Sequence, residues 1–191
     1  MQEIAPGLRR WTAFHGDWEE DVGSVAVDTA DGLVLIDPLA PPADLPSPKH
    51  VLLTLYYHAR AAAGLKARVW APARSQQPLR NRGVEAEDAA AGELPGGIVP
   101  FPTARPSEAV YWLPDHRAVV VGDVLLGAGA KPHATDEPLR LCPQRWLGKA
   151  THEDLRRSLL PLLDLPVEHV LVSHGQPVVG NGKRELARAL T

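Results

Sequence analysis

Three polar residues that could take part in chemistry follow apolar runs of the sequence. Asp123 comes directly after the run AVVVG, His174 comes directly after HVLVS, and His58 lies four residues beyond the end of VLLT. Imidazole nitrogens and carboxylate oxygens are zinc ligands, and a histidine can also accept a proton as a general base. Whether these groups act together depends on the strands and helices that position them.

The pattern of apolar runs and turn residues predicts an α/β chain with two sets of strands. Turn-forming residues separate the first three runs, which indicates an opening antiparallel meander. Thr151 and Asp154 resemble a capping box, and leucines at helical spacing predict a covering helix that Pro161 interrupts. The expected strands are 8–14, 24–27, 33–36, 50–54, 68–70, 84–87, 98–101, 108–113, 118–121 and 170–173, and the expected helical segments are 59–65, 77–81, one beginning at 151, and 183–190. This order suits a four-layer αββα sandwich.

Length and composition limit the classes of function. The 191 residues fit a single domain, 1–191, without a repeat. Because 20 basic and 23 acidic residues are mixed along the chain, we expect no nucleic-acid partner. The start lacks a secretory signal and no apolar run approaches a membrane span, so we expect a cytoplasmic protein without a membrane partner. The single cysteine excludes an internal disulfide, and the 19 prolines with many alanines suggest a bacterial source.

Four segments of the chain, in this order, resemble the metallo-β-lactamase-fold superfamily. They are LVLIDPL ending at Leu39, VLLTLYYHARAAAGL from Val51, AVYWLPDHRAVVVGDVLL from Ala109 and HVLVSHG from His169. The resemblance covers nearly the whole chain and implies an αββα sandwich of the metallo-β-lactamase type. In members that keep their metal ligands, it also implies hydrolysis of esters, amides, thioesters or phosphodiesters by a zinc-bound hydroxide.

The metal loop departs from the superfamily pattern T-H-x-H-x-D-H. The four ligand positions of that pattern hold residues that are poor zinc ligands. These residues are Leu55, Tyr57, Ala59 and Arg60. A fifth ligand position holds Ala104, whereas Asp123 and His174 match the bridging aspartate and the last histidine of the family. The resemblance therefore predicts that the standard dinuclear zinc site is lost and that no cofactor is bound.

Three interpretations of the site stay open. In the first, a pseudoenzyme binds a small molecule in a metal-depleted cleft with little or no standard hydrolase activity, and Arg60 either pairs with Asp123 in place of the metal or points to solvent. In the second, a weak hydrolase holds a single zinc on His58, Asp123 and His174, or works without metal with His174 as general base. In the third, the sandwich is a non-catalytic scaffold for a partner. The sequence leaves the oligomeric state undetermined.

Other residues are assigned to the cleft or to its support. Those expected along the cleft are Tyr57, Arg60, Ala104 and Cys142. The resemblance implies that Asp37, at the end of the strand LVLID, holds the metal loop without binding metal. Asp37 could equally accept hydrogen bonds from the turn that begins at Pro38.

Cys142, the only thiol, is a conceivable nucleophile if it lies near a histidine. No adjacent base is visible in the sequence, so we favour a small buried hydrophobic residue at this position. Trp146 is expected to pack in the core as well. His15 and Trp18 lie in a loop that could reach the mouth of the cleft.

Overall fold

The first sheet is built by the N-terminal part of the chain. The computed structural model describes all 191 residues. In chain order and in spatial order, the strands of this sheet are β1 (Gln2–Ala5), β2 (Leu8–His15), β3 (Glu20–Thr29), β4 (Gly32–Ile36), β5 (His50–Leu52), β6 (Arg68–Ala71) and β7 (Glu87–Asp88). Strands β1 to β4 pair antiparallel, which confirms the predicted meander, and β5, β6 and β7 continue the sheet in parallel.

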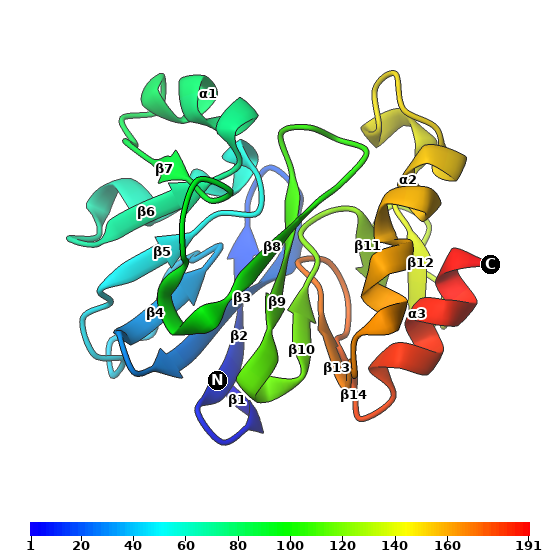
Figure 1. Cartoon of the computed structure of the whole chain (residues 1–191), viewed down its shortest axis with the longest axis horizontal. Coiled ribbons are helices and arrows are strands. Elements are labelled where there is room, and N and C mark those ends of the chain that lie inside the picture. Colours follow the sequence, from blue (N-terminus) through cyan, green and yellow to red (C-terminus); the bar gives the residue numbers. More distant parts are fainter.

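The second sheet follows in the chain and packs against the first (Figure 1). In chain order its strands are β8 (Val99–Pro102), β9 (Ala109–Leu113), β10 (Ala118–Val120), β13 (His169–Leu171) and β14 (Val178–Val179). Their spatial order is β14-β13-β10-β9-β8, and β10 runs parallel to β13. A separate antiparallel pair is formed by β11 (Leu125–Gly127) and β12 (Leu139–Leu141).

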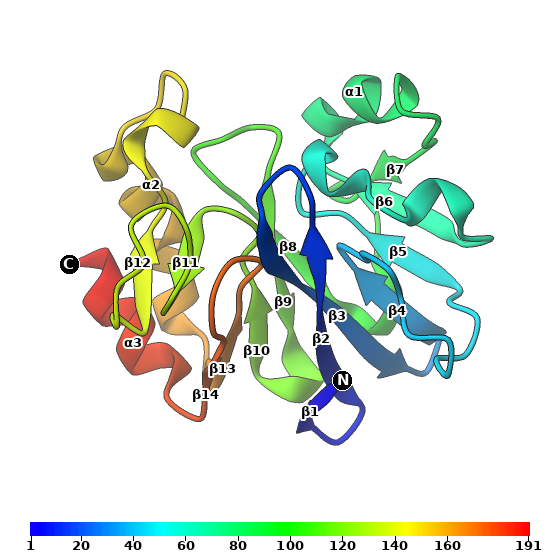
Figure 2. The same cartoon turned by 180° about the vertical axis from the view of Figure 1, so that it is seen from behind.

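Short helices cover the outer faces of both sheets (Figures 1 and 2). The α-helices are α1 (Gln76–Arg80), α2 (His152–Leu159) and α3 (Gly182–Leu190). The 3-10 helices are η1 (Tyr56–Ala59), η2 (Ala62–Gly64), η3 (Ala73–Ser75), η4 (Pro95–Gly97), η5 (Pro114–His116), η6 (Gln144–Trp146) and η7 (Leu160–Asp164). None of these helices has both the length and the apolar character needed to cross a bilayer.

Helix α2 begins and ends where the sequence predicts. The Asp154 backbone N–H donates to Thr151 Oγ1 at 3.1 Å, and the Thr151 N–H donates to Asp154 Oδ2 at 2.9 Å, which completes the capping box. Regular α-helix stops at Leu159, and η7 carries Pro161 in its first turn. The capping residues and the proline therefore set both ends of this helix.

One predicted helix is wrong. Residues 59–65 form no α-helix, but contribute to the two short 3-10 turns η1 and η2. Arg60 lies between these turns with a φ of 38°, a left-handed value that an α-helix excludes. The predicted strand 84–87 is wrong except at Glu87, where the two-residue strand β7 begins. The structure also contains strands β1, β11, β12 and β14, which the sequence pattern does not predict.

Three apolar clusters lie between successive layers. One contains side chains of both sheets and fills the space between them. The second joins α2 and α3 to the outer face of the second sheet, and the third joins η1, η2 and α1 to the outer face of the first. Along β5, Leu52 belongs to the cluster between the sheets, whereas Val51 and the following Leu53 belong to the outer cluster. This alternation buries both faces of the strand, and the predicted αββα sandwich is confirmed.

Candidate metal centre

The ends of parallel strands place the polar residues at one edge of the sandwich. Strands β4 and β5 are parallel within the first sheet, and β10 and β13 are parallel within the second. Asp37 follows β4 and Thr54 lies shortly after β5, while Asp123 and His174 lie shortly after β10 and β13. Since the carboxyl ends of parallel strands meet at one edge of a sheet, the loops that follow them can share a site.

Two isolated bridges join the sheets at this edge. Val22 of β3 bridges to His174, and Leu55 bridges to Glu108, which directly precedes β9. The loops of the two sheets are therefore held against each other where the polar residues gather.

His58, Asp123 and His174 converge at this edge. Their potential ligand atoms all lie within 4.8 Å of one another, and no other set of three or more His, Cys, Asp or Glu side chains converges in this way. His58 Nε2 is 3.1 Å and His174 Nε2 is 3.3 Å from the same atom, Asp123 Oδ1. All three side chains are buried. The position of His58 in η1, after the turn at Leu55, brings its ring inward.

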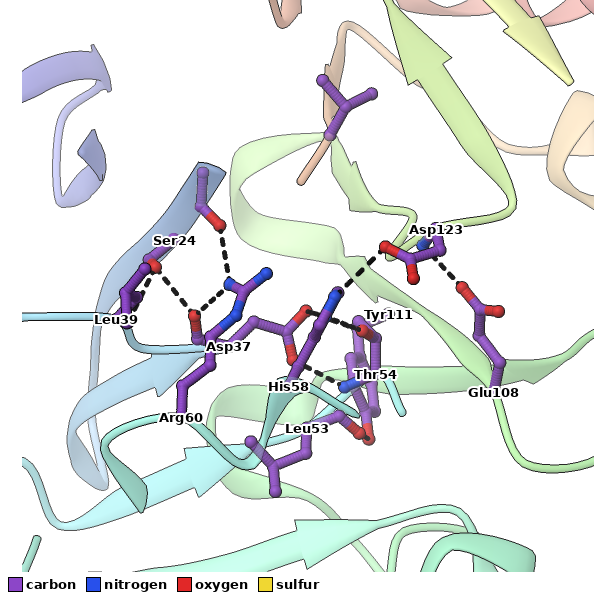
Figure 3. A network of polar contacts seen from close by, with 12 residues as sticks. Ser24, Asp37, Leu39, Leu53, Thr54, His58, Arg60, Glu108, Tyr111 and Asp123 are labelled. Atoms are coloured by element: carbon purple, nitrogen blue, oxygen red, sulfur yellow. Dashed lines mark hydrogen bonds and ion pairs between the residues drawn. The ribbon is translucent and has the colours of Figure 1, made fainter. Parts of the chain in front are cut away.

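Asp37 fixes the ring of His58 (Figure 3). Asp37 Oδ2 is 2.8 Å from His58 Nδ1 and accepts a hydrogen bond of 2.6 Å from the Thr54 hydroxyl. The other carboxylate oxygen accepts the Thr54 backbone N–H at 2.8 Å. With Nδ1 directed at Asp37, Nε2 faces Asp123, and its lone pair is available to a metal ion when the ring is neutral.

His174 is held in the same manner from the other side of the site. Its Nδ1 contacts the carboxylate of Glu20, the first residue of β3. The rings of Trp18 and Trp146 pack against the imidazole, with centroids at 5.4 and 5.8 Å. Its Nε2 therefore faces Asp123, just as that of His58 does.

Glu108 holds the backbone that carries Asp123. Its Oε1 accepts the N–H groups of Asp123 at 2.6 Å and of Val124 at 3.1 Å, and its Oε2 is 2.7 Å from Arg105 Nη1. The turn at Gly122, with a φ of 56°, brings these N–H groups over the carboxylate. Burial raises the pKa of Glu108 to about 7, although Arg105 opposes this shift.

The charges of the three donors depend on one another. Burial alone would lower the pKa of each histidine and raise that of Asp123. Contacts with Asp123 and Glu20 outweigh burial at His174 and raise its pKa to about 9. At His58, the carboxylates of Asp37 and Asp123 outweigh burial and the nearby Arg60, so its pKa is also raised. The two imidazoles hold the pKa of Asp123 well below its usual range, so this carboxylate is ionised at neutral pH.

The expected ion pair between Arg60 and Asp123 is not formed. Arg60 Nη1 donates instead to the carbonyl oxygens of Asp37 at 2.8 Å and Gly23 at 3.2 Å, and the side chain does not point to solvent (Figure 3). The physical reason is that the ring of His58 occupies the position beside Asp123. Arg60 thus ties the loop after β5 to β3 and to the residue that follows β4.

A cavity of about 360 Å³ opens onto Asp123. Four residues were expected along the cleft, and of these Tyr57 lines the cavity. Arg60 instead donates to the backbone carbonyl of Asp37, and Ala104 packs against the outer core of the second sheet. Cys142 is fully buried in that same core, and burial raises the pKa of its thiol to about 12. This thiol is therefore no nucleophile at neutral pH.

Several residues of the site had no signal in the sequence. Glu20 and Glu108 stand near strand ends without ligand spacing, and Arg105 and Arg145 are ordinary loop arginines by sequence. Trp146 packs against the core, as expected, but it also lines the cavity together with Trp18. Only the folded chain brings these residues together.

Replacing Gly122 with alanine should damage the site. A Cβ atom at this left-handed position would lie 2.6 Å from Glu108 Oε1 and 2.8 Å from Thr54 Oγ1. We expect Gly122→Ala to lower the free energy of unfolding by about 1–3 kcal/mol, measured by urea denaturation. Gly83→Ala is the matched control, because Gly83 also has a left-handed φ, of 74°, and its methyl group would meet nothing within 4 Å. Equal stability of the two variants would contradict this tight packing around Gly122.

Comparison with known proteins gives structural likenesses only. No family model and no curated protein matches the sequence. The structure is similar to the metallo-beta-lactamase family protein TTHA1429 from Thermus thermophilus, with 17% identity and a TM-score of 0.62 over 97% of this chain and 79% of that one. It is similar to TTHA1623 in a di-iron-bound form, with 23% identity and a TM-score of 0.65 over 94% and 98% of the two chains. A third similar structure is the archaeal metallo-beta-lactamase superfamily protein ST1585 from Sulfolobus tokodaii, with 14% identity and a TM-score of 0.66 over 96% and 84%.

Proposed function

Because the chain has the metallo-β-lactamase fold, we propose that it is a hydrolase that uses one divalent metal ion held by His58, Asp123 and His174. The convergence of two imidazole Nε2 atoms on one carboxylate oxygen carries this proposal. Two histidines and a carboxylate are a known donor set for a catalytic zinc ion with an open fourth position. Carboxylates behind both histidines are typical of the outer shell of such sites.

Unpartnered polar atoms support the fit of a metal ion. Asp123 Oδ1 and His174 Nε2 are buried and have no well-oriented hydrogen bond, although they lie 3.3 Å apart. Buried polar atoms in proteins nearly always have a partner. A shared metal ion would satisfy both atoms together with Nε2 of His58.

The balance of charge in the site also favours a dication. The carboxylates of the site are Asp37, Asp123, Glu108 and Glu20, and the arginines that contact them or the loop are Arg60 and Arg105. Metal binding requires both imidazoles in their neutral form. With the imidazoles neutral and the carboxylates ionised, the arginines balance two of the four negative charges. Buried charges without compensation are strongly disfavoured, and one divalent ion supplies the missing charge.

The residues present support a mononuclear centre and not a dinuclear one. The loop positions that bind metal in the T-H-x-H-x-D-H pattern hold Leu55, Tyr57, Ala59 and Arg60. Arg60 is bound to backbone carbonyls, and Tyr57 is largely exposed at the cavity. The similar protein TTHA1623 is described in a di-iron-bound form; the donors that converge in this chain suffice for one ion.

The residues of the chain have separate tasks in this proposal. A zinc ion held by His58, Asp123 and His174 would lower the pKa of a coordinated water to about 7 and so would provide a nucleophile at neutral pH. Asp37 and Glu20 orient the two histidines, and Glu108 fixes the backbone of Asp123. The cavity above Asp123 leaves room for a small substrate. This arrangement favours the single-zinc interpretation over the metal-depleted pseudoenzyme.

Metal titration tests this function directly. We expect protein stripped with a chelator to bind one equivalent of zinc or manganese, measured by calorimetry and elemental analysis. Bound metal should raise the melting temperature, because a ligand that binds only the folded state stabilises it. The metal-loaded protein should hydrolyse 4-nitrophenyl acetate, and removal of the metal should abolish this activity.

For each of these expected results, one outcome would contradict the proposal. A folded protein that takes up no metal at millimolar concentration would refute the proposal, and two tightly bound equivalents would refute its mononuclear form. Stoichiometric metal without hydrolysis of any ester, amide, thioester or phosphodiester would refute the hydrolase and leave a metal-binding protein.

A further inference from the structure

The cavity above Asp123 has a wall that the metal centre does not use. Besides Asp123 it is lined by the residues Trp18, Tyr57, Arg105, Arg145 and Trp146. Its volume of about 360 Å³ falls in the range that holds small molecules. The chemistry of these side chains therefore indicates what kind of molecule fits beside the reacting site.

Aromatic rings form one part of the wall. The rings of Trp18 and Trp146 meet edge to face with centroids 5.5 Å apart. Trp18 and Tyr57 are 42% and 56% exposed, so part of the surface of each side chain is free to contact a ligand. Rings of this kind favour contact with a planar or apolar group, since burial of their faces is favourable.

The two arginines of the wall differ in their charge partners. Arg105 is paired with Glu108 at 2.7 Å, and its charge is thereby balanced within the protein. Arg145, in η6, is exposed and has no carboxylate partner within ion-pair distance. Once a dication has balanced the buried carboxylates, Arg145 remains as one unbalanced positive charge at the cavity. A planar guanidinium is well suited to bind a carboxylate through two hydrogen bonds.

We propose that the cavity binds a small carboxylate with a planar apolar body, in which Arg145 pairs with the carboxylate and Trp18 and Trp146 contact the body. This inference rests on the proposed function, because the cavity opens onto Asp123, where the scissile bond would lie. It assigns to Arg145 a specificity role outside the metal centre.

The charge balance favours a carboxylate over a phosphate monoester. One unbalanced arginine matches a single negative charge, whereas a phosphate monoester carries about 1.5 to 2 negative charges at pH 7. A monoanion is therefore the better match.

Binding of matched probes tests the proposal. Quenching of tryptophan fluorescence would measure the affinity for 4-nitrobenzoate, for its neutral analogue 4-nitrobenzamide and for phenyl phosphate, the last by displacement of 4-nitrobenzoate. All titrations are made both in excess chelator and with zinc. We expect 4-nitrobenzoate to bind most tightly. Arg145→Gln should weaken the binding of 4-nitrobenzoate by at least about tenfold, because the charged hydrogen bonds to the carboxylate are lost, without changing the affinity for the amide.

Two further variants sharpen the result. Arg145→Lys keeps the charge but not the planar fork, so we expect an intermediate affinity. Arg157→Gln changes the net charge equally on the exposed face of α2, outside the cavity, and should leave all affinities unchanged. The proposal is overturned if Arg145→Gln has no effect in either condition, if the amide binds as tightly as the carboxylate, or if phenyl phosphate binds more tightly.

The chelator condition separates this inference from the proposed function. If the protein binds no zinc but Arg145→Gln still weakens the binding of the carboxylate, the proposed Arg145 site is supported and the proposed metal-dependent activity is refuted. If the protein binds one zinc ion but binds the carboxylate and the amide equally tightly, the proposed metal centre is supported and the proposed specificity is refuted.

Discussion

Replacing His174 with alanine is expected to lower the affinity for zinc by more than about 100-fold. Even the loss of a residue that only hydrogen-bonds to a metal ligand lowers metal affinity about 10- to 100-fold. The variant removes one of three converging donors and leaves Glu20 without its imidazole partner. Competition of zinc with a chelating dye measures the loss. Metal-dependent hydrolysis should disappear together with the metal.

His169→Ala is the matched control for this variant. His169 is also buried, lies five residues earlier in the chain at the start of β13, and accepts the Gly180 N–H through Nδ1 at 3.2 Å. We expect its removal to affect stability but not zinc affinity. If His174→Ala bound zinc as well as His169→Ala does, His174 would not be a metal ligand and the proposed centre would be wrong.

Removal of the Asp37 carboxylate should produce the largest loss of stability. In Asp37→Ala, the N–H and hydroxyl of Thr54 and Nδ1 of His58 lose their buried acceptor. Breaking a buried pair by removing one partner costs about 3–5 kcal/mol. For a chain of this size we expect a fall in melting temperature of about 6–20 °C, measured by calorimetry on the metal-free protein. The reoriented His58 should also weaken zinc binding about 10- to 100-fold.

An exposed aspartate provides the comparison. Asp28 in the first sheet pairs with Arg9, but its side chain is 55% exposed, and exposed ion pairs contribute about 0–1 kcal/mol. Asp28→Ala should therefore leave both stability and zinc affinity nearly unchanged. An equally small effect of Asp37→Ala would show that Asp37 supports neither the loop nor His58.

The alternation of apolar residues and the turn chemistry predicted most of the fold. The meander of β2, β3 and β4 and the capping box at Thr151 depend on neighbours in the chain, so local sequence was sufficient to locate them. The helix predicted over 59–65 failed because alanine propensity was overridden at Arg60. This residue adopts a left-handed conformation and donates to backbone carbonyls of β3 and of the residue after β4.

The sequence by itself thus determined the layers, and it predicted Asp123, His174 and Asp37 as residues of the site through strand ends that resemble a known fold. Only the tertiary structure decided that His58 turns inward, that Glu20 stands behind His174, and that Arg145 faces the cavity without a carboxylate partner. The physical reason is that patterns of residue type determine structure only among residues that are close in the sequence. The contact between Glu20 and His174, by comparison, joins groups 154 positions apart, and it exists only after two sheets have packed together.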